Sequence, residues 1–219
     1  MGFFTRRAKP GNTAASMLEQ ITIKPATIAP PADHEQGWEY LYFASELKTN
    51  IDGLAPDYEA MLVTSLSRNS PKSPNPFVDV RDAMTTVGTT VGLIDYIFQA
   101  ANLEKGFGKP GEPGDEAHLS LMAREIAGIY ANLLNVAMDL KSTNLGSFQK
   151  VGNDVAASCL QPLQEIRAFS DTVGSSFEKV VAELRQGIAP SEPLVLTLTL
   201  TMDEAVSQRL MSDLELLKK

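Results

Sequence analysis

The chain of 219 residues carries 27 acidic and 19 basic side chains, which give it a formal net charge of −8 at pH 7. Hydrophobic residues make up 43% of the chain, which is enough to build a folded core. The acidic balance disfavours nonspecific binding to nucleic acid. One cysteine cannot form an internal disulfide, and together with only two histidines it cannot supply a zinc site. We therefore expect an acidic globular protein that binds no nucleic acid and uses no metal or other cofactor.

Residues 1–32 are polar, punctuated by proline and enriched in basic side chains. This composition is typical of a flexible arm, which we expect to precede a single helical domain at residues 33–219. Within the arm, the β-branched run Ile21-Thr22-Ile23 is a candidate short strand. Phe3, Phe4 and the nearby arginines offer a weaker alternative, a peripheral contact with anionic lipid or an acidic partner. No apolar signal-peptide segment follows the start, so we expect a cytoplasmic protein without integral membrane association.

The first predicted helix begins at or just after Asp33, a favourable N-cap residue. Apolar residues then recur at helical spacing: Trp38, Leu41, Ala44 or Ser45, Leu47, Ile51 and Leu54. Gly53 and Pro56 interrupt the pattern, and residues 57–66 predict a second, short helix. Residues 68–76 hold three prolines and predict a loop.

Residues 80–101 predict one long amphipathic helix, because their apolar residues alternate at spacings of four and three. These residues are Val80, Met84, Val87, Val91, Ile94, Phe98 and Ala101. Gly88 and Gly92 lie four residues apart beside this stripe and favour a close approach of another helix there. The glycine-rich segment 105–115 lacks the Gly-Lys-Ser/Thr sequence of a phosphate-binding loop and predicts a surface loop.

The clearest pattern follows Asp115, the predicted N-cap of a third helix. Its apolar residues are Leu119, Met122, Ile126, Ile129, Leu133, Val136 and Leu140. Asn144 and Gly146 are typical of a helix end. A fourth helical region extends from about residue 147 to residue 186, and Pro162 should bend it or divide it into two helices.

After Gly187 the apolar period changes to two, which predicts a strand over about residues 194–201. Its apolar face consists of Leu194, Leu196, Leu198 and Leu200. Residues 20–23 are a candidate partner strand. Thr201 and Glu204 have the spacing of a capping box and predict a short C-terminal helix.

Few residues are candidates for chemistry. His34 and His118 lie outside any metal-ligand spacing, and we interpret both as surface or capping histidines. Cys159 occupies an apolar helical position and is interpreted as a small buried hydrophobic residue. Asp95 interrupts an apolar run; an exposed position is favoured over a buried acid in a pocket. We therefore name no catalytic, cofactor-binding or metal-binding residue and expect no enzymatic activity.

Together the patterns predict a mainly α protein, an up-and-down bundle of four to five helices with a minor β element and a short C-terminal helix. We expect a protein-binding or assembly function. An unpaired strand with an apolar face is prone to associate, so we expect a homodimer or a protein partner at this face, with an interface at Leu194, Leu196, Leu198 and Leu200.

One alternative is a bundle that binds a small apolar ligand in its core, lined by Met84, Met122, Met138, Tyr96, Tyr130 and Phe98. An enzyme of unrecognised type is the third hypothesis.

Overall fold

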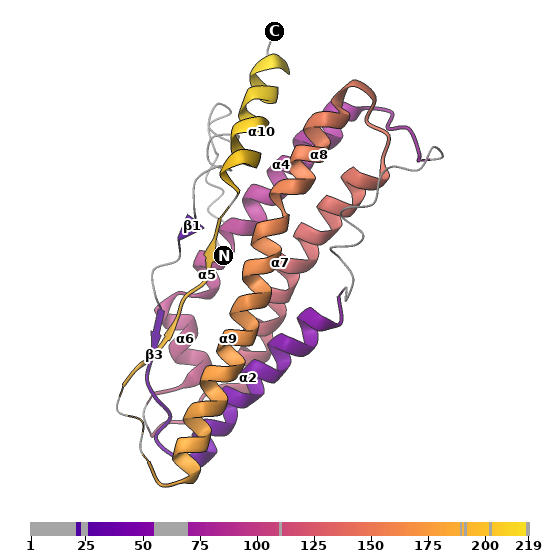
Figure 1. The fold of residues 1–219 in the computed structure, drawn as a ribbon. Helices are drawn as coiled ribbons and strands as arrows, with labels where there is room; N and C mark the ends of the chain where they lie inside the picture. Colours follow the sequence, from indigo (N-terminus) through magenta and orange to yellow (C-terminus); the bar gives the residue numbers. More distant parts are fainter. Residues whose placement is uncertain are drawn as a thin grey trace, which may run out of the picture.

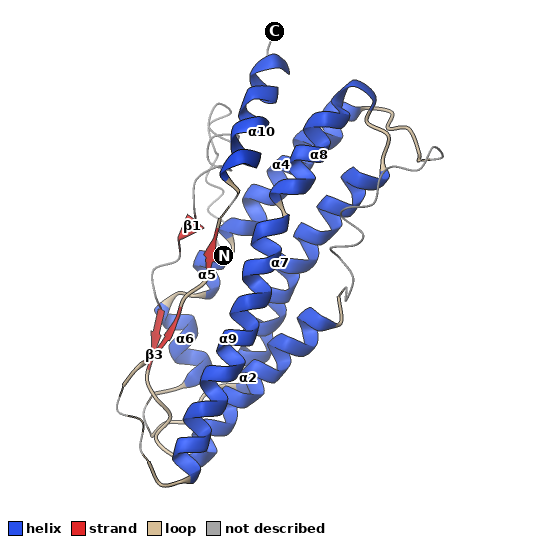
Figure 2. Ribbon diagram, in the orientation of Figure 1, coloured by secondary structure: helices blue, strands red, loops and turns tan. Residues whose placement is uncertain are grey.

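The computed structural model describes residues 21–22, 26–54, 70–109, 111–188, 190, 192–201 and 203–217. Its helices form an elongated bundle with two small β pairings along one side (Figure 1, Figure 2). The mainly α fold with a minor β element is therefore confirmed. The predicted helix at 57–66 and residues 1–20 of the predicted arm lie outside the described residues.

The helices run alternately up and down the bundle (Figure 1). Helix α2 spans His34–Asp52 and is followed by α4 (Pro76–Gly92), α5 (Ile94–Ile97) and α6 (Ala100–Phe107). Helix α7 (Glu116–Ser142) is the longest, and the 3-10 turn η1 (Gly146–Phe148) leads into α8 (Gln149–Ser158) and α9 (Leu160–Arg185). The chain ends with α10 (Glu204–Leu217). Because α7 packs against α2, α4, α8 and α9, it forms the centre of the bundle.

The C-terminal strand region pairs within the chain. Strand β1 (Ile21–Thr22) runs antiparallel to β4 (Thr199–Leu200), and β2 (Ala26–Ile28) runs antiparallel to β3 (Leu194–Leu196). Ala26 and Ile28 are buried, so residues 26–28 belong to the folded part of the molecule rather than to the arm expected from composition. The predicted pairing with residues 20–23 is correct for Ile21 and Thr22.

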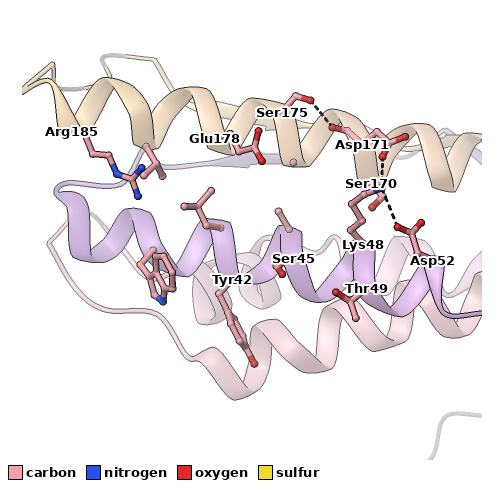
Figure 3. Close-up of a pocket in the computed structure, with 15 residues that line it drawn as sticks. Tyr42, Ser45, Lys48, Thr49, Asp52, Ser170, Asp171, Ser175, Glu178 and Arg185 are labelled. Atoms are coloured by element: carbon pink, nitrogen blue, oxygen red, sulfur yellow. Dashed lines mark hydrogen bonds and ion pairs between the residues drawn. The ribbon is translucent and has the colours of Figure 1, made fainter.

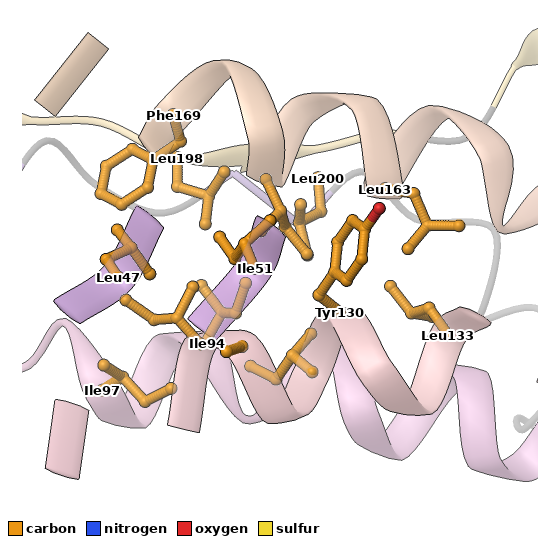
Figure 4. Close-up of a cluster of buried hydrophobic side chains, with 14 of the residues drawn as sticks. Leu47, Ile51, Ile94, Ile97, Tyr130, Leu133, Leu163, Phe169, Leu198 and Leu200 are labelled. Atoms are coloured by element: carbon orange, nitrogen blue, oxygen red, sulfur yellow. The ribbon is translucent and has the colours of Figure 1, made fainter. Parts of the chain in front are cut away.

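Most of the strand leucines are part of the core. Leu196, Leu198 and Leu200 are 3%, 2% and 2% exposed, whereas Leu194 is half-buried. Figure 4 shows Leu198 and Leu200 among Ile51, Tyr130 and other core side chains of the helices. The leucine face predicted from the alternating pattern exists, and it packs on the protein's own helices.

The predicted single helix over 80–101 is wrong in its continuity. Helix α4 ends at Gly92, α5 ends at Ile97, and Gln99 has an extended backbone before α6 begins. The bend places Phe98 against Phe169 of α9, with ring centroids 5.4 Å apart. Burial of this aromatic pair outweighs the local preference for an unbroken helix.

The close helix approach expected at Gly92 is also wrong. Apart from its chain neighbours and the backbone of its own helix, no described atom lies within 4 Å of the position that a Cβ of Gly92 would take. The tight approach occurs instead at Gly106 of α6, where a Cβ would lie 2.8 Å from Leu119 Cδ2 of α7. Residues 105–107, predicted to be part of a loop, therefore belong to a helix that packs closely on α7.

The structure defines two helix starts that the sequence patterns left open or misassigned, those of α9 and α10. The fourth helical region is divided at Cys159, so Pro162 lies in the first turn of α9, where its missing N–H disturbs little. Asp203, not Thr201, caps α10, since its carboxylate accepts a hydrogen bond from the Val206 amide. Thr201 instead bonds to Glu165 of α9, so the predicted capping box is wrong.

Candidate functional site

Helix α2 presents two different stripes of residues. One is buried in the core and consists of Tyr40, Phe43, Leu47 and Ile51. The other faces outward at spacings of three and four and consists of Trp38, Leu41, Ser45, Lys48 and Asp52. Asp33 caps the helix by accepting the Gln36 amide at 2.9 Å, which fixes the start of both stripes. Trp38, read from the sequence as part of the apolar face, is 58% exposed.

Helix α9 presents a matching second stripe. It consists of Asp171, Gly174, Glu178, Val181 and Arg185, again at spacings of three and four. The two helices are antiparallel, because Gly37 lies against Val181 at one end and Lys48 lies against Asp171 at the other. Each stripe therefore extends over 14 residue steps, or about 21 Å of helix.

An open groove of about 1100 Å³ lies between these two stripes (Figure 3). Its floor is formed where the helices touch: a Cβ at Gly37 would lie 3.2 Å from side-chain atoms of Val181 and Leu184. Its middle is lined by small residues, Ala44, Ser45, Gly174 and Ser175. A side chain or helix backbone from another molecule can thus approach the floor most closely at the centre.

The end of the groove near the C-terminus of α2 is acidic. The Lys48 ammonium lies 3.1 Å from Asp171 Oδ1 and 3.2 Å from Asp52 Oδ2. The hydrogen bond to Asp171, together with the one to Asp52, raises the pKa of Lys48. One cation shared by two carboxylates leaves one net negative charge at this end. Glu178, further along α9, is exposed and forms no salt bridge with any described residue.

The opposite end of the groove is aromatic and carries one basic group. Trp38 and Tyr42 line it together with Leu41. Arg185 donates a hydrogen bond from Nε to Nε2 of His34, 3.2 Å away, and makes no salt bridge within the described part of the chain. His34 therefore lies at the surface, as predicted, and it orients the guanidinium at the mouth of the groove.

Ser170 supplies an unsatisfied polar atom in the lining. The residue is 3% exposed, and its hydroxyl has no hydrogen-bond partner among the described residues. Neighbouring hydroxyls on the same helix bond to the carbonyl four residues back: Thr172 to Ala168 and Ser175 to Asp171. A buried hydroxyl without a partner costs about 1–3 kcal/mol, which a bound polar group would recover.

A smaller hollow of about 290 Å³ lies between α4 and α7 and is lined by Asp79, Asp82 and Asp139. Asp79 already accepts a hydrogen bond from Ser73 at 2.5 Å, and Asp82 pairs with Arg81. Across the described residues, no three His, Cys, Asp or Glu side chains are grouped so that they could hold a metal ion. We therefore treat the groove between α2 and α9 as the candidate site.

The residues singled out from the sequence lie away from this groove, apart from His34 at its mouth. Cys159 is buried, and burial raises the pKa of its thiol to about 12, which keeps it protonated and unreactive. Asp95 is exposed, as favoured. His118 lies in the first turn of α7, where its amide bonds to the Asp115 cap.

The residues proposed to line a core ligand site do not surround one space. Met84, Met122, Tyr130 and Phe98 are buried in the packed core, whereas Tyr96 is 58% exposed.

Every helix in the described part of the chain is too short or too polar to span a bilayer.

No protein-family model, curated protein or solved structure matches this chain.

Proposed function

We propose that this protein is a non-enzymatic protein-binding bundle, and that the groove between α2 and α9 binds an amphipathic helix of a partner protein. Both stripes that border the groove have the three-four spacing with which one helix meets another. A third helix laid between them keeps in register with both over about four turns. The occupant is therefore a helix rather than an extended peptide.

The small residues at the centre support the same occupant. Apart from its chain neighbours and the backbone of its own helix, no described atom lies within 4 Å of the Cβ position of Gly174, and Ser45 is exposed opposite it. Small side chains allow the axes of two helices to approach at the lower end of the usual range of about 8–10 Å. A partner helix can consequently approach the part of the groove that Ser170 lines.

The observation that carries the proposal is Ser170. A folded chain rarely leaves a buried hydroxyl without a partner, and this one lines the groove. The exposed Trp38 ring at the far end supplies the large aromatic surface that often anchors a protein interface. Binding thus has a polar anchor at one end and an aromatic anchor at the other.

Self-association through the strand leucines remains a sequence-based prediction. Leu196, Leu198 and Leu200 are covered by the protein's own core, so the apolar face no longer supplies the reason for a dimer. Light scattering at tens of micromolar measures the oligomeric state directly. A partner helix in the groove requires no dimer.

The test uses Trp38, which is the single tryptophan of the chain. Helical peptides are selected from a displayed library with the full-length protein as bait, and each binder is titrated while tryptophan fluorescence is followed. We expect binders that change the Trp38 signal and that lose at least tenfold in affinity when Gly174→Leu fills the centre of the groove. Selection of no helical peptide would contradict the proposal.

Gly128→Leu is the matched control. Gly128 lies within α7, and, as at Gly174, no described atom outside its own helix backbone and chain neighbours lies within 4 Å of its Cβ position. Both substitutions replace a helical glycine by leucine and improve helix propensity to the same degree. Equal binding by the two variants would place the peptide outside the groove and reject the proposed site.

A further inference from the structure

The charges that border the groove follow a pattern of their own. Asp171, Glu178 and Arg185 are exposed residues of α9, and each lies seven residues after the one before. Seven residues correspond to about 10.5 Å, close to two helical turns. Figure 3 shows Glu178 and Arg185 directed from α9 toward the groove. A second helix in the groove offers side chains at the same interval, residue i and residue i+7.

From this pattern we infer that the partner helix carries an acidic residue opposite Arg185 and basic residues seven and fourteen positions further on, opposite Glu178 and Asp171. The inference rests on the proposed function, since it describes the ligand of the same groove. The partner is thus a predominantly basic amphipathic helix with one acidic end. Such a charge pattern complements the acidic lining and the net charge of −8 of the whole chain.

Each of the three positions carries a charge that the described residues do not fully neutralise. Glu178 has no salt bridge, and Arg185 has only the imidazole of His34 as a hydrogen-bond partner, among the described residues. At the third position, Lys48 neutralises one of the two carboxylates of Asp52 and Asp171. A basic side chain of the partner compensates the other carboxylate.

The aromatic end of the groove indicates where the partner helix should carry apolar residues. Trp38, Leu41 and Tyr42 lie across from Val181, one turn from Arg185. An apolar side chain three or four positions after the acidic residue would therefore pack on this aromatic surface. With the acidic residue near its N-terminus and the basic ones toward its C-terminus, the partner helix is also favoured by its own macrodipole.

The experiment compares two synthetic 18-residue helical peptides that differ only in charge order. The matching peptide has Glu at position 1, Leu at positions 4 and 5, and Lys at positions 8 and 15; the swapped peptide has the same leucines, Lys at positions 1 and 15 and Glu at position 8, so both have the same net charge. Each is titrated into the full-length protein while Trp38 fluorescence is followed. We expect the matching peptide to bind at least tenfold more tightly at low salt, with a difference that shrinks as salt is added.

Charge reversal on the protein tests the assigned contacts. The double variant Glu178→Lys with Arg185→Glu leaves the net charge unchanged and should invert the preference between the two peptides. The single variants Arg185→Glu and Lys179→Glu change the net charge equally, but Lys179 lies outside the groove lining. We expect only Arg185→Glu to weaken binding of the matching peptide. Circular dichroism confirms that these variants remain folded.

The outcomes separate this inference from the proposed function. If both peptides bind the wild type with equal affinity and Gly174→Leu weakens the binding of both, the groove binds helices but the charge pattern is wrong. If the double variant keeps the original preference, the assignment to Glu178 and Arg185 is wrong. If neither peptide binds while library selection still yields groove-binding helices, this inference fails alone; if selection also yields none, the proposed function fails with it.

Discussion

Two helix pairs in this protein join a lysine to aspartates, with opposite consequences. In the α2–α9 groove, the side chains of Lys48 and Asp171 are 56% and 68% exposed. In the contact between α8 and α10, Lys150 bonds to Asp213 at 2.6 Å and Arg209 bonds to Asp154 at 3.2 Å, and the side chains of the two aspartates are only 5% and 12% exposed. Exposed pairs contribute little to folding and stay accessible to a ligand, whereas buried carboxylates depend on their cations.

The difference arises from what surrounds each pair. Val206 and Leu210 of α10 are buried, and the side chains of Asp213 and Asp154 in the same helix contact are 5% and 12% exposed. Beside Lys48, the small residues of the groove leave the charges in contact with solvent. The α8–α10 contact therefore contributes to the fold, whereas the charges of the groove stay exposed to solvent.

The largest expected effect is the loss of apolar packing at α10. Leu210 is fully buried, so Leu210→Ala should destabilise the protein by about 2–5 kcal/mol, as truncations of buried leucines do. Ser45→Ala in the groove should change stability by less than about 0.5 kcal/mol. Urea unfolding measures both, with Ser212→Ala on the exposed side of α10 as the control. Equal midpoint shifts for Leu210→Ala and Ser212→Ala would mean that α10 is not docked as described.

The next largest effect is a difference in stability between variants of Lys150 and Lys48. Lys150→Met leaves the buried Asp213 carboxylate without its cation and should cost about 1–3 kcal/mol. Lys48→Met removes a cation from solvent-exposed carboxylates and should cost below about 1 kcal/mol. Each variant loses one lysine and gains the same apolar side chain, so thermal unfolding compares them directly. A greater loss for Lys48→Met would reverse the assignment of the two regions.

The smallest expected effect is a dependence on pH. The hydrogen bond from Lys150 holds the pKa of Asp213 below its usual value, against the raising effect of burial. Because the pKa of the folded state is the lower one, the stabilisation is present above the unfolded-state value of about 3.9 and is lost as pH falls through the folded value. Urea midpoints of the wild type and Asp213→Asn should therefore differ at pH 6 and converge in acid. A gap that does not shrink as the pH falls would show that the carboxylate charge is not the cause.

Lys48, in the groove, makes a contribution to stability that changes at alkaline pH rather than in acid. The pKa of Lys48 is raised by its bonds to Asp171 and Asp52, so its contribution is present below the unfolded-state value of about 10.4 and is lost as pH rises through the folded value. Its exposure makes this contribution minor. Stability near neutral pH should consequently depend little on Lys48.

Local patterns predicted the helices where one stripe of residues faces one neighbour. The stripe from Leu119 to Leu140 gave the position of α7, and Asp33 and Asp115 gave the starts of α2 and α7, because an N-cap acts over three residues. The same reasoning failed at Phe98 and Gln99. The break there is stabilised by Phe169, which is about 70 residues away in the sequence and leaves no local signal.

The candidate site was hidden for the same reason. Its two walls come from residues 38–52 and 170–185, and each wall mixes aromatic, small and charged residues, so neither has the composition of a motif. One signal was present: α2 holds more large apolar residues than a single buried stripe can use. Trp38 and Leu41 could have been recognised as a second stripe once Tyr40, Phe43 and Leu47 were assigned to the core.

By itself the sequence determined the helical class and the burial of Cys159, since periodicity and helix caps act within a few turns of the chain. It also indicated extended structure near residues 194–201, but the structure divides the predicted single strand into β3 and β4, which pair with different partners. The tertiary structure alone decided that Leu196, Leu198 and Leu200 pack inward, that α9 meets α2 at the Gly37 contact and that Ser170 is buried without a partner among the described residues. These features depend on side chains brought together from distant segments. Their energies come from burial and contact in the folded bundle, which no local pattern of residues encodes.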